Sequence, residues 1–155
     1  MLQRIQSIYF LFASMVIFAL FVFPLAHNIF VDGKLVNVSV TGVYEILNGQ
    51  DKQTHPFLPL TIATAFAALI PLALIFLYKN RKQQITISYV AVLVLIGYSF
   101  WMAQTVKSVV GPITLEYKNM GIGLFLTSLS IILIIFAVKA IQKDEKLVKS
   151  ADRLR

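Results

Sequence analysis

The sequence predicts an all-α membrane protein, an antiparallel bundle of four transmembrane helices with a small extramembrane β-hairpin or sheet. The first reason is composition, because 58% of the 155 residues are hydrophobic and they gather in four long runs. The second is that Lys and Arg cluster beside alternate ends of these runs, which is typical of membrane proteins. The third is the stretch IFVDGKLVNVSV, whose alternating apolar and polar residues around a central Asp-Gly predict a hairpin.

Each apolar run is close to the roughly 20 residues that a helix needs to cross about 30 Å of hydrocarbon. The expected spans, in a single membrane domain of residues 1–155, cover about residues 5–26, 57–78, 85–105 and 120–138. They leave outer loops at about 27–56 and 106–119, and a tail at 139–155. The first run exceeds the apolar part of a signal peptide, which has roughly 7–15 residues, so we interpret it as a retained span.

Orientation follows from the basic residues that lie outside the spans. One set comprises Arg4, the short loop with Lys79, Arg81 and Lys82, and the basic residues of the tail. The opposite loops hold four Lys balanced by four acidic residues, so the whole net charge of +7 falls on one side. We therefore expect both termini to lie in the cytoplasm. We also expect the partner of these basic residues to be the phospholipid bilayer rather than nucleic acid. The tail is expected to continue the fourth helix by two or three turns.

Some chemistries are excluded by the residues that the chain lacks. It has no cysteine, which rules out disulfides and thiolate ligands. The cores of the four runs lack ionisable residues, which argues against a proton pump or an ion-coupled carrier. His27 and His55 flank the first outer loop and are candidates for a shared metal ion or an interfacial haem. No carboxylate cluster accompanies them, so we favour two interfacial polar residues and predict no metal or cofactor.

A candidate ligand or partner face lies in the second and third spans. Pro71 interrupts the second span and is expected to kink it. The outer end of the third span carries Tyr98, Trp101, Gln104 and Thr105, the last three on one helical face. This face suits a lipid headgroup, a quinone ring or a partner helix. The alternative is an aromatic belt with Gln104 hydrogen-bonded across the bundle, and we favour that interpretation.

The first outer loop is expected to form the hairpin. With Asp32 and Gly33 as a type I′ turn, Val31 faces Lys34 and the next pairs follow outward from there. The segments VYEIL (Val43–Leu47) and ITLEY (Ile113–Tyr117) are expected to add strands, giving an antiparallel sheet from loops one and three. The alternative is a loosely ordered loop.

The opening MLQRIQSIYFLFAS and the short loop YKNRKQQI resemble a family of small four-span membrane proteins of Bacteroidota, a domain of unknown function. The resemblance covers essentially the whole chain and implies an inner-membrane location with the outer loops in the periplasm. It implies no catalytic or ligand residues. Gln3, Arg4 and Gln6 begin the first span at its cytoplasmic end. They are expected to cap the helix, bind headgroups or contact a partner, and the loop Lys79, Arg81 and Lys82 is expected to bind headgroups or a partner.

Three functions are compatible with these features. The favoured one is a non-enzymatic accessory or scaffold subunit of a membrane complex, with protein partners in the membrane. The second is binding or transfer of a lipid or quinone between spans two and three, near Pro71 and Tyr98. The third, a membrane enzyme, is less favoured because Asp32, Glu45, Asp51 and Glu116 show no catalytic spacing. Glu116 beside His27 or His55 in a cleft would favour the enzyme.

Overall fold

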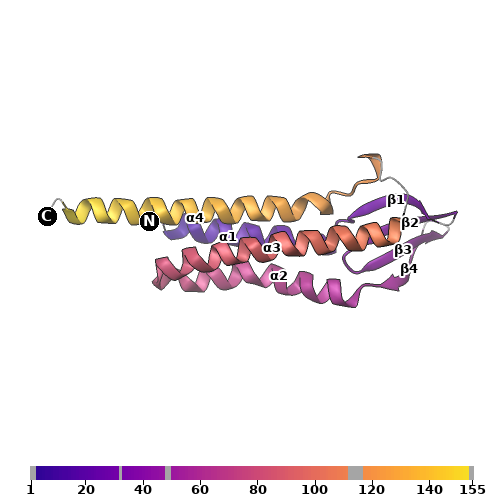
Figure 1. Cartoon of the computed structure of the whole chain (residues 1–155), viewed down its shortest axis with the longest axis horizontal. Coiled ribbons are helices and arrows are strands. Elements are labelled where there is room, and N and C mark those ends of the chain that lie inside the picture. Colours follow the sequence, from indigo (N-terminus) through magenta and orange to yellow (C-terminus); the bar gives the residue numbers. More distant parts are fainter. Residues whose placement is uncertain (1–2, 32, 48–49, 112–116, 154–155) are drawn as a thin grey trace.

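The chain folds into a layer of long helices capped at one end by a β-sheet (Figure 1). The computed structural model describes residues 3–31, 33–47, 50–111 and 117–153. The helices are α1 (Gln3–Phe18), α2 (Leu58–Phe76), α3 (Arg81–Val110) and α4 (Gly123–Arg153), with 3-10 turns η1 (Ala19–Phe21), η2 (Leu77–Lys79) and η3 (Tyr117–Asn119). The strands are β1 (Ala26–Val31), β2 (Lys34–Ser39), β3 (Gly42–Leu47) and β4 (Gln50–Pro56). Both termini lie at the end of the helical layer opposite the sheet (Figure 1).

The predicted all-α fold class is wrong, because a four-stranded antiparallel sheet of order β1-β2-β3-β4 forms part of the core. Residues 26–56 supply all four strands that the described part of the chain contains. Strand β4 has the sequence QDKQTHP, whose lack of apolar alternation hid it from the sequence prediction. Of the predicted ITLEY strand, residues 113–116 lie outside the described residues and Tyr117 belongs to η3.

The predicted register of the first hairpin is confirmed. Ile29 pairs with Val36, Phe30 with Leu35, and Val31 with Lys34. Gly33 has φ of 77°, the left-handed conformation that the turn requires, while Asp32 lies outside the described residues. The predicted third segment is also a strand, and β3 pairs Glu45 with Val36 of β2. The turn residues and the alternation of apolar and polar residues were therefore sufficient to predict the first three strands.

The inner face of the sheet packs on the helices. Ile29, Val36 and Val38 are buried, and they join Leu20 and Leu25 in one continuous apolar cluster. The segment before α4 closes this junction, because Met120 bridges to Ala26 of β1 and the Gly121 N–H donates to the Leu25 carbonyl at 2.9 Å. The sheet is thus an integral part of the fold.

Three helical segments are long and apolar enough to cross a membrane: Leu58–Lys79, Arg81–Val110 and Gly123–Val148. The first apolar helix, Ile5–Phe21, is shorter than the predicted span 5–26, because the chain leaves the helix before Pro24 and enters β1 at Ala26. Helix α3 contains the predicted span 85–105, whereas α2 with η2 covers all but the first residue of the span 57–78, and α4 begins three residues after the predicted start of the span 120–138. Helix α4 also includes the predicted helical tail. Large apolar side chains such as Phe66, Phe76 and Phe100 point outward, 66%, 78% and 71% exposed. The helices are therefore compatible with a membrane protein.

The four helices pack side by side, and α1 and α3 each contact both α2 and α4. Hydroxyl groups link them across buried interfaces. Ser14 of α1 donates to the Ala68 carbonyl of α2 at 2.7 Å, and Ser130 of α4 donates to the Ala13 carbonyl of α1 at 3.0 Å. Ala13 and Ala68 are fully buried, and such small side chains let helix backbones approach closely.

Candidate functional site

An apolar groove of about 300 Å³ lies between α2 and α3. We call it the α2–α3 groove, and its walls are Ala63, Phe66, Ala67, Ile70, Val94, Gly97, Tyr98 and Trp101. Small residues on both helices make the space, and a Cβ built on Gly97 would meet no atom within 4 Å. The volume is at the lower end of ligand pockets, which enclose roughly 300–1,000 Å³. The groove thus fits one apolar chain or ring.

Tyr98, the one phenol among the described residues that line the groove, is hydrogen-bonded through its hydroxyl to a neighbouring side chain. Its hydroxyl lies 2.6 Å from Thr64 Oγ1, and Thr64 in turn donates to the Leu60 carbonyl at 2.7 Å. A hydroxyl has a single proton, so Tyr98 is the donor to Thr64. Because both hydroxyls are hydrogen-bonded within the protein, neither side chain needs a polar partner from a ligand, and the groove offers an apolar surface.

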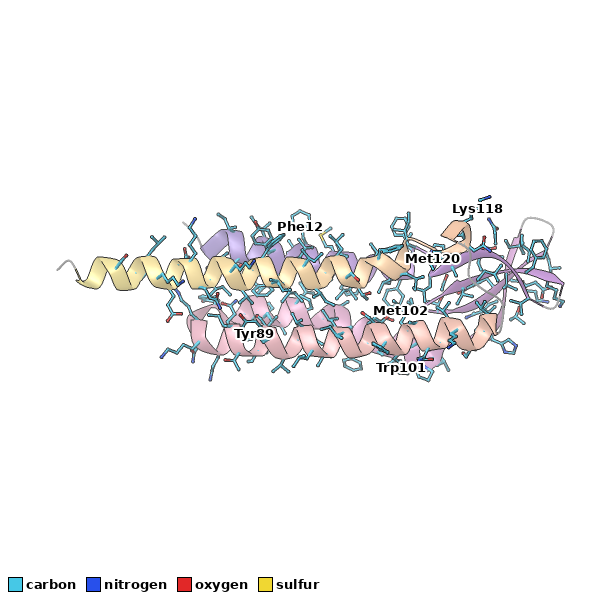
Figure 2. All side chains as sticks on the ribbon, turned by 45° about the horizontal axis from the view of Figure 1, so that its top comes forward. Phe12, Tyr89, Trp101, Met102, Lys118 and Met120 are labelled. Atoms are coloured by element: carbon cyan, nitrogen blue, oxygen red, sulfur yellow. The ribbon has the colours of Figure 1, made fainter. Side chains whose placement is uncertain are left out.

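The groove contains two of the five residues of the predicted ligand face. Tyr98 and Trp101 line it, and Figure 2 shows Trp101 at the outer surface of α3. Pro71 is buried within α2, which continues through it as a helix. Gln104 is exposed, and Thr105 donates to the Trp101 carbonyl at 3.0 Å. Ala63, Ala67 and Gly97 were not predicted as groove residues, although small-residue spacing in the second span was a signal for close approach.

A second cavity, of about 480 Å³, lies between the inner face of the sheet and the outer end of α3. We call it the sheet cavity, and it is lined by Val31, Lys34, Val36, Val43, Glu45, Thr54, His55, Pro56, Phe57 and Val109. Lys34 and Glu45 form an ion pair within it, with Lys34 Nζ 3.0 Å from Glu45 Oε1 and 3.3 Å from Oε2. The side chain of Lys34 is 62% exposed, whereas that of Glu45 is only 11% exposed.

Sequence reasoning missed the sheet cavity because it depends on the pairing of β2 with β3. The hairpin register places Lys34 on the same face as Val36, and Glu45 pairs with Val36. Lys34 and Glu45 are therefore diagonal neighbours on one face of an antiparallel pair, a distance that long side chains can bridge. The sequence feature that could have indicated the cavity is a charged residue on the core-facing side of each strand, Lys34 in β2 and Glu45 in β3.

The structure does not bring the two histidines together. His27 lies on β1 and His55 on β4, the opposite edges of the sheet. Three strand spacings of about 4.8 Å separate these edges, roughly 14 Å in all, which is too far for a shared metal ion. Among the described residues no group of three or more His, Asp or Glu is placed to hold a metal ion.

The contact between Glu116 and a histidine that would favour an enzyme is not tested, because Glu116 lies outside the described residues, as does Asp32. Asp51 is an exposed residue of β4. Glu45, which the sequence offered only as one acid among several, shares the sheet cavity with His55 instead.

At the opposite end of the helices, Gln6 of α1 meets Asp144 of α4. The Gln6 side-chain amide donates to Asp144 Oδ2 at 3.1 Å, and both residues are buried. Gln6 is therefore engaged inside the protein, whereas Lys79 and Lys82 are exposed and Arg81 is half-buried at the same end. Gln3 and Arg4 belong to the first turn of α1, and their side chains lie outside the described part of the structure.

The model of one protein family, described as a domain of unknown function (DUF4293), matches residues 2–154. No curated protein and no solved structure matches the chain. The match extends over nearly the whole length, including the four helices and the sheet, so the chain belongs to this family.

Proposed function

Taking membership of this family as the premise, we propose that the protein is an integral inner-membrane protein that binds a lipid or quinone in the α2–α3 groove. The observation that carries the proposal is the groove itself, an apolar space left open by Ala63, Ala67 and Gly97. A bundle that served only as a membrane anchor would gain dispersion energy by filling this space.

The depth of the groove supports a ligand from the outer half of the bilayer. The segment Leu58–Lys79 has 22 residues, about 33 Å of helix, which matches roughly 30 Å of hydrocarbon. Ala63 and Ile70 lie about 8 and 18 Å from Leu58 along this helix. The groove would therefore begin in the leaflet on the sheet side, from which it would be reached, and end near the bilayer midplane.

The proposed orientation has the sheet in the periplasm and both termini in the cytoplasm. The termini and the η2 turn share one end of the helical layer (Figure 1). The basic residues of the tail and the loop Lys79, Arg81 and Lys82 come from these segments, and an excess of Lys and Arg marks the cytoplasmic side.

Native mass spectrometry of the protein purified in mild detergent tests the proposal. We expect the wild-type chain to retain a lipid or quinone, and Gly97→Leu to retain about tenfold less because the leucine side chain occupies the groove. Ala103→Leu is the matched control, because Ala103 is an exposed residue of α3 that does not line the groove. A wild-type chain that carries no apolar molecule would contradict the proposal, as would equal retention by the two variants.

An accessory or scaffold role is the second candidate, and the cytoplasmic end of α4 favours it. This end runs beyond the other helices (Figure 1), and Leu147 and Val148 on it are 50% and 49% exposed. Exposed Lys143 and Lys146 lie on the same segment, so an acidic partner helix with an apolar stripe would fit it. A protein that co-purifies reproducibly in the same experiment would support this role.

A further inference from the structure

The sheet cavity lies beyond the outer end of the α2–α3 groove along the same two helices. Phe57 immediately precedes α2, and Val109 lies eight residues, or about 12 Å of helix, beyond Trp101 on α3. With Leu58 at the outer edge of the hydrocarbon, the cavity falls at the level of lipid headgroups. A lipid whose chain lies in the groove would place its headgroup here, so the inference below rests on the proposed lipid site.

The polar groups of the cavity form a compact, net-neutral set. The Glu45 carboxylate is largely buried and receives Lys34 on both oxygens, while the Lys34 ammonium is mostly exposed at the mouth. Thr54 and His55, both exposed, add further hydrogen-bonding groups at the mouth. The deeper walls are apolar, formed by Val36, Val43 and Phe57 among others.

The ion pair selects among headgroups by charge. A purely anionic headgroup that approached Lys34 would also meet the buried carboxylate of Glu45, and like charges at short range are repelled. A zwitterion avoids this conflict. Its cation lies against Glu45 and its anion against Lys34, so each of the four charges keeps an opposite neighbour.

The cation is further restricted by the type of donor that a carboxylate prefers. A primary ammonium offers three N–H groups for charge-assisted hydrogen bonds to Glu45. A quaternary ammonium has none and is usually held by several aromatic faces. Phe57 is the only phenyl or indole ring among the described residues that line the cavity. We therefore expect weak binding of a quaternary headgroup, which needs several aromatic faces.

We propose that the sheet cavity binds the headgroup of a zwitterionic phospholipid with a primary ammonium, a phosphoethanolamine group. The ammonium contacts Glu45, the phosphate contacts Lys34 with support from Thr54 and His55, and an acyl chain extends into the α2–α3 groove. No covalent step is involved. The site is a selective lipid-binding site.

Native mass spectrometry of the full-length protein with an equimolar mixture of phosphatidylethanolamine, phosphatidylcholine and phosphatidylglycerol of identical acyl chains tests this proposal. We expect the wild-type chain to retain phosphatidylethanolamine in preference to the other two. Glu45→Gln removes the charge that pairs with the ammonium and should reduce this preference about tenfold, with total bound lipid little changed. Asp51→Asn is the matched control, because Asp51 is an exposed residue of β4 outside the cavity lining, and it should keep the preference.

A second variant guards against misfolding of Glu45→Gln. Lys34 is mostly exposed, so Lys34→Gln is expected to fold normally. It should retain less of all three lipids, because it loses a contact to the phosphate that they share, while Glu45 maintains the preference for a primary ammonium. Lys107→Gln, on the exposed surface of α3, should behave as wild type. Lipid retention without headgroup preference, a preference untouched by Glu45→Gln, or a total retention untouched by Lys34→Gln would overturn this inference alone and leave Lys34–Glu45 as a cross-strand structural pair. A wild-type chain that retains no lipid would overturn the groove proposal as well.

Discussion

Gln6 and Asp144 come from opposite ends of the chain, yet they meet in the interior between α1 and α4. Gln6 is 4% exposed and Asp144 is 7% exposed, and the amide of the first donates to the carboxylate of the second. A buried carboxylate requires such a donor, because removing it from water is costly. The contact fixes the register of two helices at the end where both termini lie.

We expect Gln6→Leu to lower the free energy of unfolding by about 1–3 kcal/mol, because it leaves the Asp144 carboxylate without this donor. The double variant Gln6→Leu/Asp144→Leu should recover part of the loss, since two apolar side chains need no hydrogen bond. Thermal denaturation of the purified variants, arranged as a double-mutant cycle, measures the coupling. Additive effects within about 0.5 kcal/mol would show that the contact does not couple the helices.

Gln6 also shows why the partner of a side chain is hard to assign from sequence. Its place at the start of an apolar run suggested a capping, headgroup or partner contact, and only the packing of α1 on α4 brings Asp144 within reach. The buried stripe of α4 passes through Ile134, Ala137 and Ile141 to Asp144 at helical spacing. A stripe that ends in a charge predicts a polar partner on the neighbouring helix but does not identify it.

At the scale of elements, the junction between the sheet and α4 depends on close backbone contact. The N–H groups of Gly121 and Gly123 donate to the carbonyls of Leu25 and Pro24 at 2.9 and 3.1 Å. A Cβ at Gly121 would overlap the carbonyl oxygen of Pro24, a backbone atom that cannot move aside independently. This contact holds the start of α4 against the segment that leads into β1.

Gly121→Ala should therefore destabilise the protein by about 1–3 kcal/mol, because the backbone must shift to admit the methyl group. Gly97→Ala is the matched control, since its Cβ would enter open space, and we expect it to change stability by less than about 0.5 kcal/mol. The melting temperatures of the two variants in the same detergent provide the comparison. Equal melting temperatures would contradict the docked arrangement.

The elements that could be predicted are those with a local signal. The apolar runs predicted the positions of the helices, and the Asp-Gly turn with its alternation predicted the β1–β2 register. Strand β4 could not be predicted, because it is a polar edge strand held by pairing with β3. A ligand site was expected near Pro71 and Tyr98. Tyr98 lines the groove but Pro71 is not among its lining residues, because the shape of the groove depends on Ala63, Ala67 and Gly97, whose effect on helix spacing is a tertiary property.

At the scale of the whole molecule, the proposed access of lipid from the outer leaflet depends on one orientation of the chain. The α2–α3 groove faces the outer leaflet, and the sheet cavity lies at the level of the headgroups of that leaflet, only if the sheet is periplasmic. The distribution of charge supports this arrangement, because the outer loops are balanced and the net charge of +7 belongs to the other end.

Single cysteines report this orientation without background, because the chain has no native cysteine. Asp51 is an exposed residue of the edge strand β4, and Ser150 is an exposed residue near the end of α4, so Asp51→Cys and Ser150→Cys place a thiol at the two ends of the molecule. In spheroplasts, a membrane-impermeant maleimide should label Asp51→Cys before lysis and Ser150→Cys only after lysis. Labelling of Ser150→Cys in intact spheroplasts, with Asp51→Cys protected until lysis, would contradict the proposed orientation.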